Sequence, residues 1–167
     1  AFKRALELNA NYTEAALNLA VTYNDLGQYE LAQQVYRSAI HRDVRGEQEV
    51  DPFARGKIAN LHADLAHAYL EVDMPNEAVM EYRNAIRLCP HFGDLRVKLA
   101  EVYRELGDLV AARYELEEAV RTRPDYGPAR VALGVLLLVG GQRASALSVW
   151  DEAVRRDPNN KAAEMYL

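Results

Sequence analysis

The feature that most constrains this chain is an internal repeat with a period of 34 residues. Four columns of residues recur at this spacing. They are Pro90, Pro124 and Pro158; Ala78, Ala112 and Ala146; Ala85, Ala119 and Ala153; and Leu65, Leu99 and Leu133. A unit of this size cannot bury its apolar face alone, so a fixed period predicts that neighbouring units stack and share one continuous core.

The first unit repeats the same columns, but its offset to the second is 46 residues, which is one period plus 12. The matching residues are Leu19, Tyr23, Ala32, Tyr36 and Ala39. We therefore expect an insertion at residues 45–58. Asp51 and Pro52 are a good helix start, as cap and first-turn proline, so part of the insertion is expected to lengthen the following helix by about two turns.

Within each unit the apolar residues fall at helical spacing on both sides of a short break. In the third unit Leu95, Leu99, Val102, Tyr103 and Leu106 precede the break at Gly107-Asp108. Glycine favours the left-handed conformation that ends a helix, and the proline after the second helix prevents its continuation. Each unit is thus predicted to be a helical hairpin, in which alanine columns face the large residues Tyr82, Leu116 and Trp150.

These columns resemble the tetratricopeptide repeat family along essentially the whole chain. The matching first-helix motifs are Leu19-Ala20-x-x-Tyr23, Leu65-Ala66-x-x-Tyr69 and Leu99-Ala100-x-x-Tyr103, and the second-helix motifs include Ala78-x-x-x-Tyr82-x-x-Ala85 and Ala146-x-x-x-Trp150-x-x-Ala153. Leu137, Asp73 and Val44 depart from the pattern. The resemblance implies an all-α solenoid, a right-handed superhelix whose concave groove is lined by first helices and holds a peptide or amphipathic helix of another protein.

The periodicity divides residues 1–167 into one array of repeats. Residues 1–10 are expected to end an upstream repeat, 13–44, 59–92, 93–126 and 127–160 to be complete hairpins, and 161–167 to begin a further repeat or a capping helix. Because the chain starts at Ala1 in a helical pattern, we interpret it as a segment of a longer protein. The excess of arginine over lysine favours a bacterial source, which would place the chain in the cytoplasm or periplasm.

Composition and charge argue against nucleic acid as the partner of this chain and against a membrane span. The net charge is −5 and there is no basic run, so nucleic acid is a poor partner for this surface. The apolar stretch from Val131 to Gly141 is far shorter than the roughly 20 residues that span a membrane. The single cysteine excludes an internal disulfide or a cysteine zinc cage. Another protein is the expected partner.

The helical phase relative to the leucine columns predicts which residues line the groove. They are Leu17, Val21, Asn24, Asn60, Asp64, His67, Lys98, Glu101, Arg104, Val131, Val135 and Leu138. The middle of this set is polar and its end is apolar, which is typical of an interaction surface. Two interpretations of the apolar end stay open: an exposed binding site, or a surface covered by Met165, Tyr166 and further repeats.

The inserted residues Phe53 and Arg55 are candidates for a second contact surface. No metal site is expected, because His62 and His67 are five residues apart and diverge by about 140° on a helix. No cofactor site or catalytic residue is expected either, since no strand is predicted and therefore no glycine-rich phosphate loop follows one. The leading hypothesis is a non-enzymatic adaptor that binds another protein. The alternative is a structural segment of a longer array, attached to a catalytic or membrane-bound domain, or a self-association module.

Overall fold

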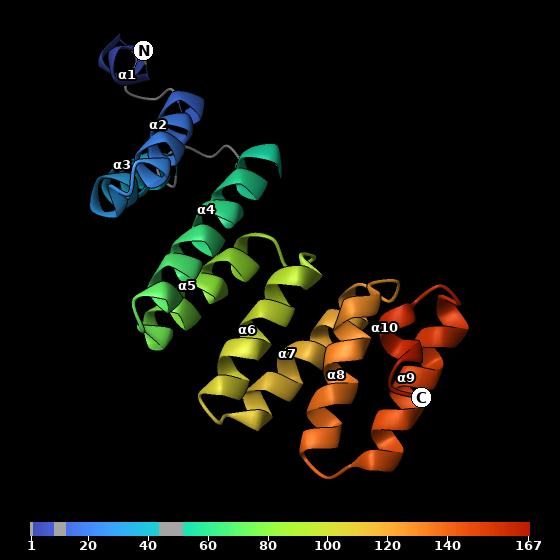
Figure 1. The fold of residues 1–167 in the computed structure, drawn as a ribbon. Coiled ribbons are helices and arrows are strands. Elements are labelled where there is room, and N and C mark those ends of the chain that lie inside the picture. Colours follow the sequence, from blue (N-terminus) through green and yellow to red (C-terminus); the bar gives the residue numbers. More distant parts are fainter. Residues whose placement is uncertain (1, 9–12, 44–51) are drawn as a thin grey trace.

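The computed structural model describes residues 2–8, 13–43 and 52–167, and every regular element in these ranges is an α-helix (Figure 1). The helices are α1 (Phe2–Leu8), α2 (Thr13–Asp25), α3 (Tyr29–Asp43), α4 (Pro52–Glu71), α5 (Pro75–Leu88), α6 (Gly93–Glu105), α7 (Leu109–Thr122), α8 (Gly127–Val139), α9 (Arg143–Arg156) and α10 (Lys161–Glu164). The expected all-α solenoid is confirmed.

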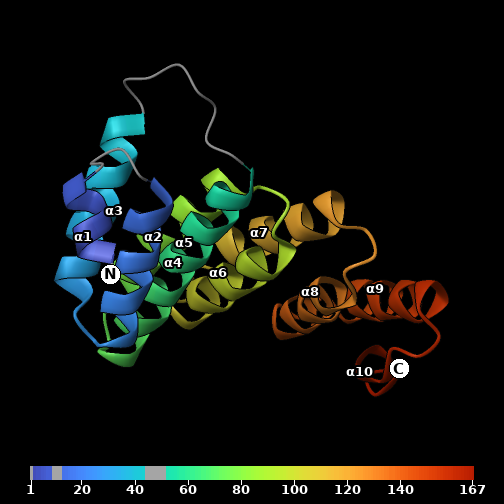
Figure 2. The ribbon, with the colours of Figure 1, turned by 90° about the horizontal axis from the view of Figure 1, so that it is seen from above.

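Consecutive helices form hairpins, which stack in the order of the sequence (Figures 1 and 2). Within hairpins, α2 packs on α3, α4 on α5, α6 on α7 and α8 on α9, and between hairpins α5 packs on α6 and α7 on α8. Helix α4 has 20 residues because it begins at Pro52, so residues 52–58 of the insertion belong to it. Residues 44–51, with the remainder of the insertion and Val44, lie outside the described residues.

The core pairs small residues with large ones. Ala78, Ala112 and Ala146 are completely buried, and Trp150 is 2% exposed. Gly134 lies directly against the indole, since a Cβ at this position would be 2.2 Å from Trp150 Nε1. The contact between α8 and the indole of α9 therefore depends on a residue without a side chain.

The turns inside the hairpins use a left-handed residue. Gly27, Gly107 and Gly141 have φ of +69°, +79° and +77°, and Asp73 takes the same place in the second repeat with φ +57°. Aspartate tolerates this conformation better than most residues, but its Cβ still makes it less favourable than for glycine.

Asp73→Gly is expected to raise the free energy of unfolding by about 0.5–1 kcal/mol, because glycine adopts a positive φ without strain. Urea denaturation followed by circular dichroism measures the change. The matched control is Gly107→Ala, which meets no atom within 4 Å and should lower stability by about 1 kcal/mol through backbone strain alone. Equal stability of Asp73→Gly and the parent chain would contradict the prediction.

Candidate functional site

An open cavity of about 410 Å³ lies along the first helices of the last repeats, and we name it the α8 groove. Its lining residues are Val97, Ala100, Glu101 and Arg104 of α6, Leu116 of α7, Pro128, Val131, Ala132, Val135 and Leu136 of α8, and Asn160, Ala162 and Tyr166 at the C-terminal end. Val131 and Val135 are one helical turn apart, so both face the cavity. Glu101 and Arg104 place opposite charges at its edge.

Two contacts fix the position of the C-terminal residues that line the α8 groove. Tyr166 stacks on Trp150 with ring centroids 4.5 Å apart and an angle of 14° between the rings. Asn160 caps α10, since its Oδ1 accepts a hydrogen bond of 3.0 Å from the backbone N–H of Ala163. Tyr166 therefore forms one wall of the cavity without filling it, while Met165 stays 74% exposed and does not line it.

The structure brings four of the sequence-predicted groove residues together in this cavity: Glu101, Arg104, Val131 and Val135. Leu138 is on the same helix but lies beyond the cavity, 42% exposed. The α8 groove thus coincides with the boundary between the polar middle and the apolar end of the predicted surface.

The predicted polar residues Asn60, Asp64, His67 and Lys98 are exposed on α4 and α6, outside the α8 groove. Desolvation raises the pKa of Asp64, and the positive charge of Lys98 opposes this shift. His67 Nδ1 lies 3.9 Å from a carboxylate oxygen of Glu71 on the next turn of α4.

The prediction for Leu17 is wrong, because its side chain is 2% exposed and belongs to the core. Leu17 packs with Ala20, Tyr36 and Ile58. Ile58 lies in the inserted turns of α4. Its side chain packs in the same cluster as Leu17, so the insertion contributes to the burial of Leu17. Val21 is half-buried on α2, and Asn24 lines a different cavity, described below.

The two inserted candidates differ in exposure. Phe53 is 68% exposed, and the Lys57 ammonium lies 4.7 Å from the centroid of its ring. Arg55 is half-buried near Cys89, where burial raises the pKa of the thiol and the arginine charge lowers it. A second contact surface at Phe53 and Arg55 stays a prediction.

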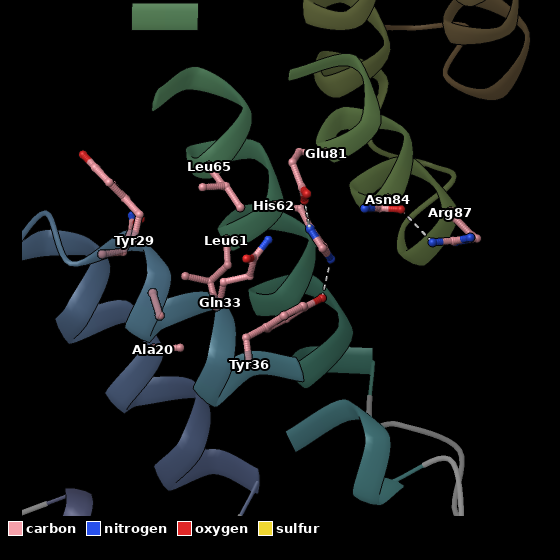
Figure 3. Close-up of a pocket in the computed structure, with 12 residues that line it drawn as sticks. Ala20, Tyr29, Gln33, Tyr36, Leu61, His62, Leu65, Glu81, Asn84 and Arg87 are labelled. Atoms are coloured by element: carbon pink, nitrogen blue, oxygen red, sulfur yellow. Dashed lines mark hydrogen bonds and ion pairs between the residues drawn. The ribbon is translucent and has the colours of Figure 1, made fainter. Parts of the chain in front are cut away.

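A second cavity lies between the first and second hairpins, and we name it the α3–α4 cleft (Figure 3). It has two parts of about 310 and 280 Å³, which share Tyr29, Gln33 and Leu65. The first part is also lined by Ala20, Asn24, Ala32, Tyr36, Leu61, His62, Glu81, Asn84 and Arg87, and the second by Glu30, Ala68, Tyr69 and Val72.

A hydrogen-bonded chain of three side chains crosses the α3–α4 cleft (Figure 3). His62 Nδ1 lies 2.5 Å from Glu81 Oε2, and Tyr36 Oη is hydrogen-bonded to His62 Nε2. Burial raises the pKa of Tyr36, so its hydroxyl stays protonated and donates to the imidazole. His62 thereby connects α3, α4 and α5.

Within residues 2–8, 13–43 and 52–167 no group of three or more His, Cys, Asp or Glu side chains is arranged to hold a metal ion. His62 is bound to Tyr36 and Glu81, whereas the side chain of His67 is 65% exposed. The same described residues include no helix with both the length and the apolar character needed to cross a membrane.

Sequence reasoning named Tyr166 only as a residue that covers the apolar end in one interpretation, and it missed Asn160 and Ala162 in the α8 groove. Asn160 caps α10 and Ala162 lies in this helix. Extending the period by one unit from Pro128, which lines the same cavity, would have identified Ala162. The residues of the α3–α4 cleft were missed for a different reason. Leu65 and Ala32 occupy packing columns, which predict burial and not a cavity.

The fold and the groove define a helical-repeat solenoid of the class that builds protein-interaction surfaces. Sequence models of the tetratricopeptide repeat match residues 103–166, 63–127 and 1–34. The chain belongs to the tetratricopeptide repeat family.

Solved structures share this fold at low sequence identity. A crystal structure of MamA is 22% identical with a TM-score of 0.66, over 96% of this chain and 87% of that one. YrrB, described as a TPR protein with an unusual peptide-binding site, is 20% identical with a TM-score of 0.63, over 98% and 78%. The first TPR of Spaghetti (RPAP3), bound to an HSP90 peptide, is 19% identical with a TM-score of 0.58, over 66% and 87%. No curated protein matches the sequence significantly.

Proposed function

We propose that this chain is a non-enzymatic interaction module that binds a peptide or amphipathic helix of another protein in the α8 groove. The observation that carries the proposal is the cavity itself, which exposes the half-buried residues Val97, Val131 and Val135 beside charged groups. An apolar concavity rimmed by polar side chains is typical of surfaces that bind other proteins.

The shape of the apolar surface favours a helical ligand. Val131 and Val135 form a stripe along α8, and Val97 of α6 lines the same cavity. An amphipathic helix can place apolar residues at i, i+3 and i+4 against such a stripe. Glu101 and Arg104 at the edge then favour a partner that carries both signs of charge.

Packing of the helices keeps the site in shape before a partner arrives. Trp150 Nε1 donates a hydrogen bond of 3.2 Å to the Val131 carbonyl, and Tyr166 stacks on the same indole. A preorganised surface loses little conformational entropy when it binds. YrrB and Spaghetti support the proposal by analogy, since one is described with a peptide-binding site and the other with a bound peptide.

Val135→Glu is expected to abolish capture of the partner from a lysate of the source organism, because it buries a carboxylate in the apolar surface. Leu138→Glu is the matched control: it lies on the same helix, adds the same charge and is not among the residues that line the cavity. Quantitative mass spectrometry should find a protein retained by the parent chain and by Leu138→Glu, and lost with Val135→Glu.

Hydrogen–deuterium exchange with the captured partner locates the contact. The proposal requires slower exchange in α6 and α8 when the partner is bound. Equal capture by both glutamate variants, or protection confined to other helices, would contradict binding in the α8 groove. Circular dichroism of each variant confirms that the fold is retained.

A further inference from the structure

At the junction between the first and second hairpins, positions that are buried in the later repeats are only half-buried. Helix α5 packs along α6 and α7 along α8. The leucine column is 0% exposed at Leu99 and 8% at Leu133, but Leu65 is only half-buried. Ala32 is also half-buried, whereas its equivalents Ala78, Ala112 and Ala146 are completely buried. Side chains that form the core elsewhere thus line the α3–α4 cleft.

Side chains that line the cleft join the helices around it. The rings of Tyr36 and His62 meet edge to face, with centroids 4.8 Å apart and planes at 86°. Both rings, with Glu81, form the hydrogen-bonded chain that joins α3, α4 and α5. These bonds fix α3, α4 and α5 relative to one another, which favours a preformed cavity.

The charges of the cleft are separated along its length. Glu30 lines only the part near Val72, and Arg87 lines only the part near Tyr36. The Arg87 guanidinium donates to Asn84 Oδ1 at 2.7 Å, and neither Arg87 nor Glu30 forms an ion pair within the described ranges. Apolar walls lie between a negative end and a positive end.

We propose that the α3–α4 cleft is a second protein-binding site, which takes an extended segment of a partner with an apolar side chain between a basic and an acidic residue. The apolar side chain enters between Ala32 and Leu65, the basic residue lies at Glu30 and the acidic residue at Arg87. Glu30 and Tyr36 are about 9 Å apart along α3, a span that an extended segment covers with about three residues. This site is separate from the α8 groove.

A phage-displayed library of random heptapeptides tests the proposal without a known partner. The library is selected on the parent chain, and each enriched peptide is then measured by fluorescence anisotropy. We expect one class of peptides that carries a basic and an acidic residue on opposite sides of an aliphatic or aromatic residue. Ala32→Phe fills the cleft and should weaken this class by about tenfold or more, whereas Val135→Glu should leave it unchanged. Peptides that bind in the α8 groove should be weakened by Val135→Glu and unaffected by Ala32→Phe.

Charge reversal gives a test that does not depend on the fold tolerating a larger residue, because Glu30 and Arg87 are both exposed. Selection on Arg87→Glu should enrich peptides that carry a basic residue on both sides of the apolar residue. Selection on Glu30→Lys should enrich peptides that carry an acidic residue on both sides. The proposal is overturned if no enriched class is sensitive to Ala32→Phe, or if the reversals leave the charge pattern of the sensitive class unchanged.

Discussion

Trp150→Ala is expected to lower the free energy of unfolding by about 3–5 kcal/mol, which is the usual cost of removing a fully buried aromatic side chain. The indole is 2% exposed, fills the space above Gly134, stacks on Tyr166 and donates to the Val131 carbonyl. Every one of these contacts joins α9 to α8 or to the C-terminal residues. The substitution therefore removes the centre of the last repeat.

The loss should be confined to the C-terminal part of the array, because the units of a repeat protein contact only their neighbours. Hydrogen–deuterium exchange is expected to accelerate in α8, α9 and α10, while α4 and α5 keep their protection. Urea denaturation measures the total change. Trp150→Phe is the matched control, which keeps a ring in the core and should lose clearly less stability. A loss below about 1 kcal/mol for Trp150→Ala would contradict this account of the core.

Partner binding in the α8 groove should weaken in the same variant. Tyr166 and Val131 line the cavity and both contact the indole. Loss of Trp150 thus removes the support of two walls without touching the partner. A variant that unfolds locally and still binds with unchanged affinity would place the binding site elsewhere.

The repeat pattern predicts most of the architecture because the residues that recur at the period are those buried between helices. Ala78, Ala112 and Ala146 recur at the fixed period, and all three are completely buried in the structure. The same reasoning assigned Glu101, Arg104, Val131 and Val135 to one surface, and in the structure these residues line one cavity. The phase of a regular helix determines which side chains share a face.

The pattern fails where the spacing changes. The columns of the first repeat match those of the second, yet the offset of 46 residues does not say how the two hairpins are placed. Leu17 was therefore assigned to the groove although Ile58 covers it, and Leu65 was assigned to the core although it lines the α3–α4 cleft. Periodicity carries no information about how two hairpins are placed when the spacing between them departs from the period.

One feature of the repeat was visible in the sequence and was not recognised. His62–Glu81 and Arg96–Glu115 occupy the same two columns, one period apart, and each pair joins the two helices of its hairpin. The Arg96 and Glu115 side chains are 2.6 Å apart at their closest atoms and each is 12% exposed. In the fourth repeat Arg130 continues the first column, but Val149 stands where the acidic partner is expected. Arg130 instead donates to the Pro124 carbonyl and lies 3.8 Å from Glu152.

Glu115→Ala is expected to lower the free energy of unfolding by about 2–3 kcal/mol, because it leaves the Arg96 guanidinium largely buried without its counter-charge. Arg96 Nε has no hydrogen-bond partner among the described residues even in the parent chain, so the carboxylate is the main compensation for burying this cation. Urea denaturation of the single variant measures the cost.

The double substitution Arg96→Leu with Glu115→Leu separates a buried charge from a lost attraction. Replacing both partners by apolar residues removes the desolvation penalty together with the pair, so most of the lost stability should return. Equal losses in the single and double variants would mean that the ion pair itself contributes the stability. Recovery in the double variant would instead show that the pair joins α6 to α7 at little net gain in stability, and that the cost of the single variant comes from the unpaired charge of Arg96.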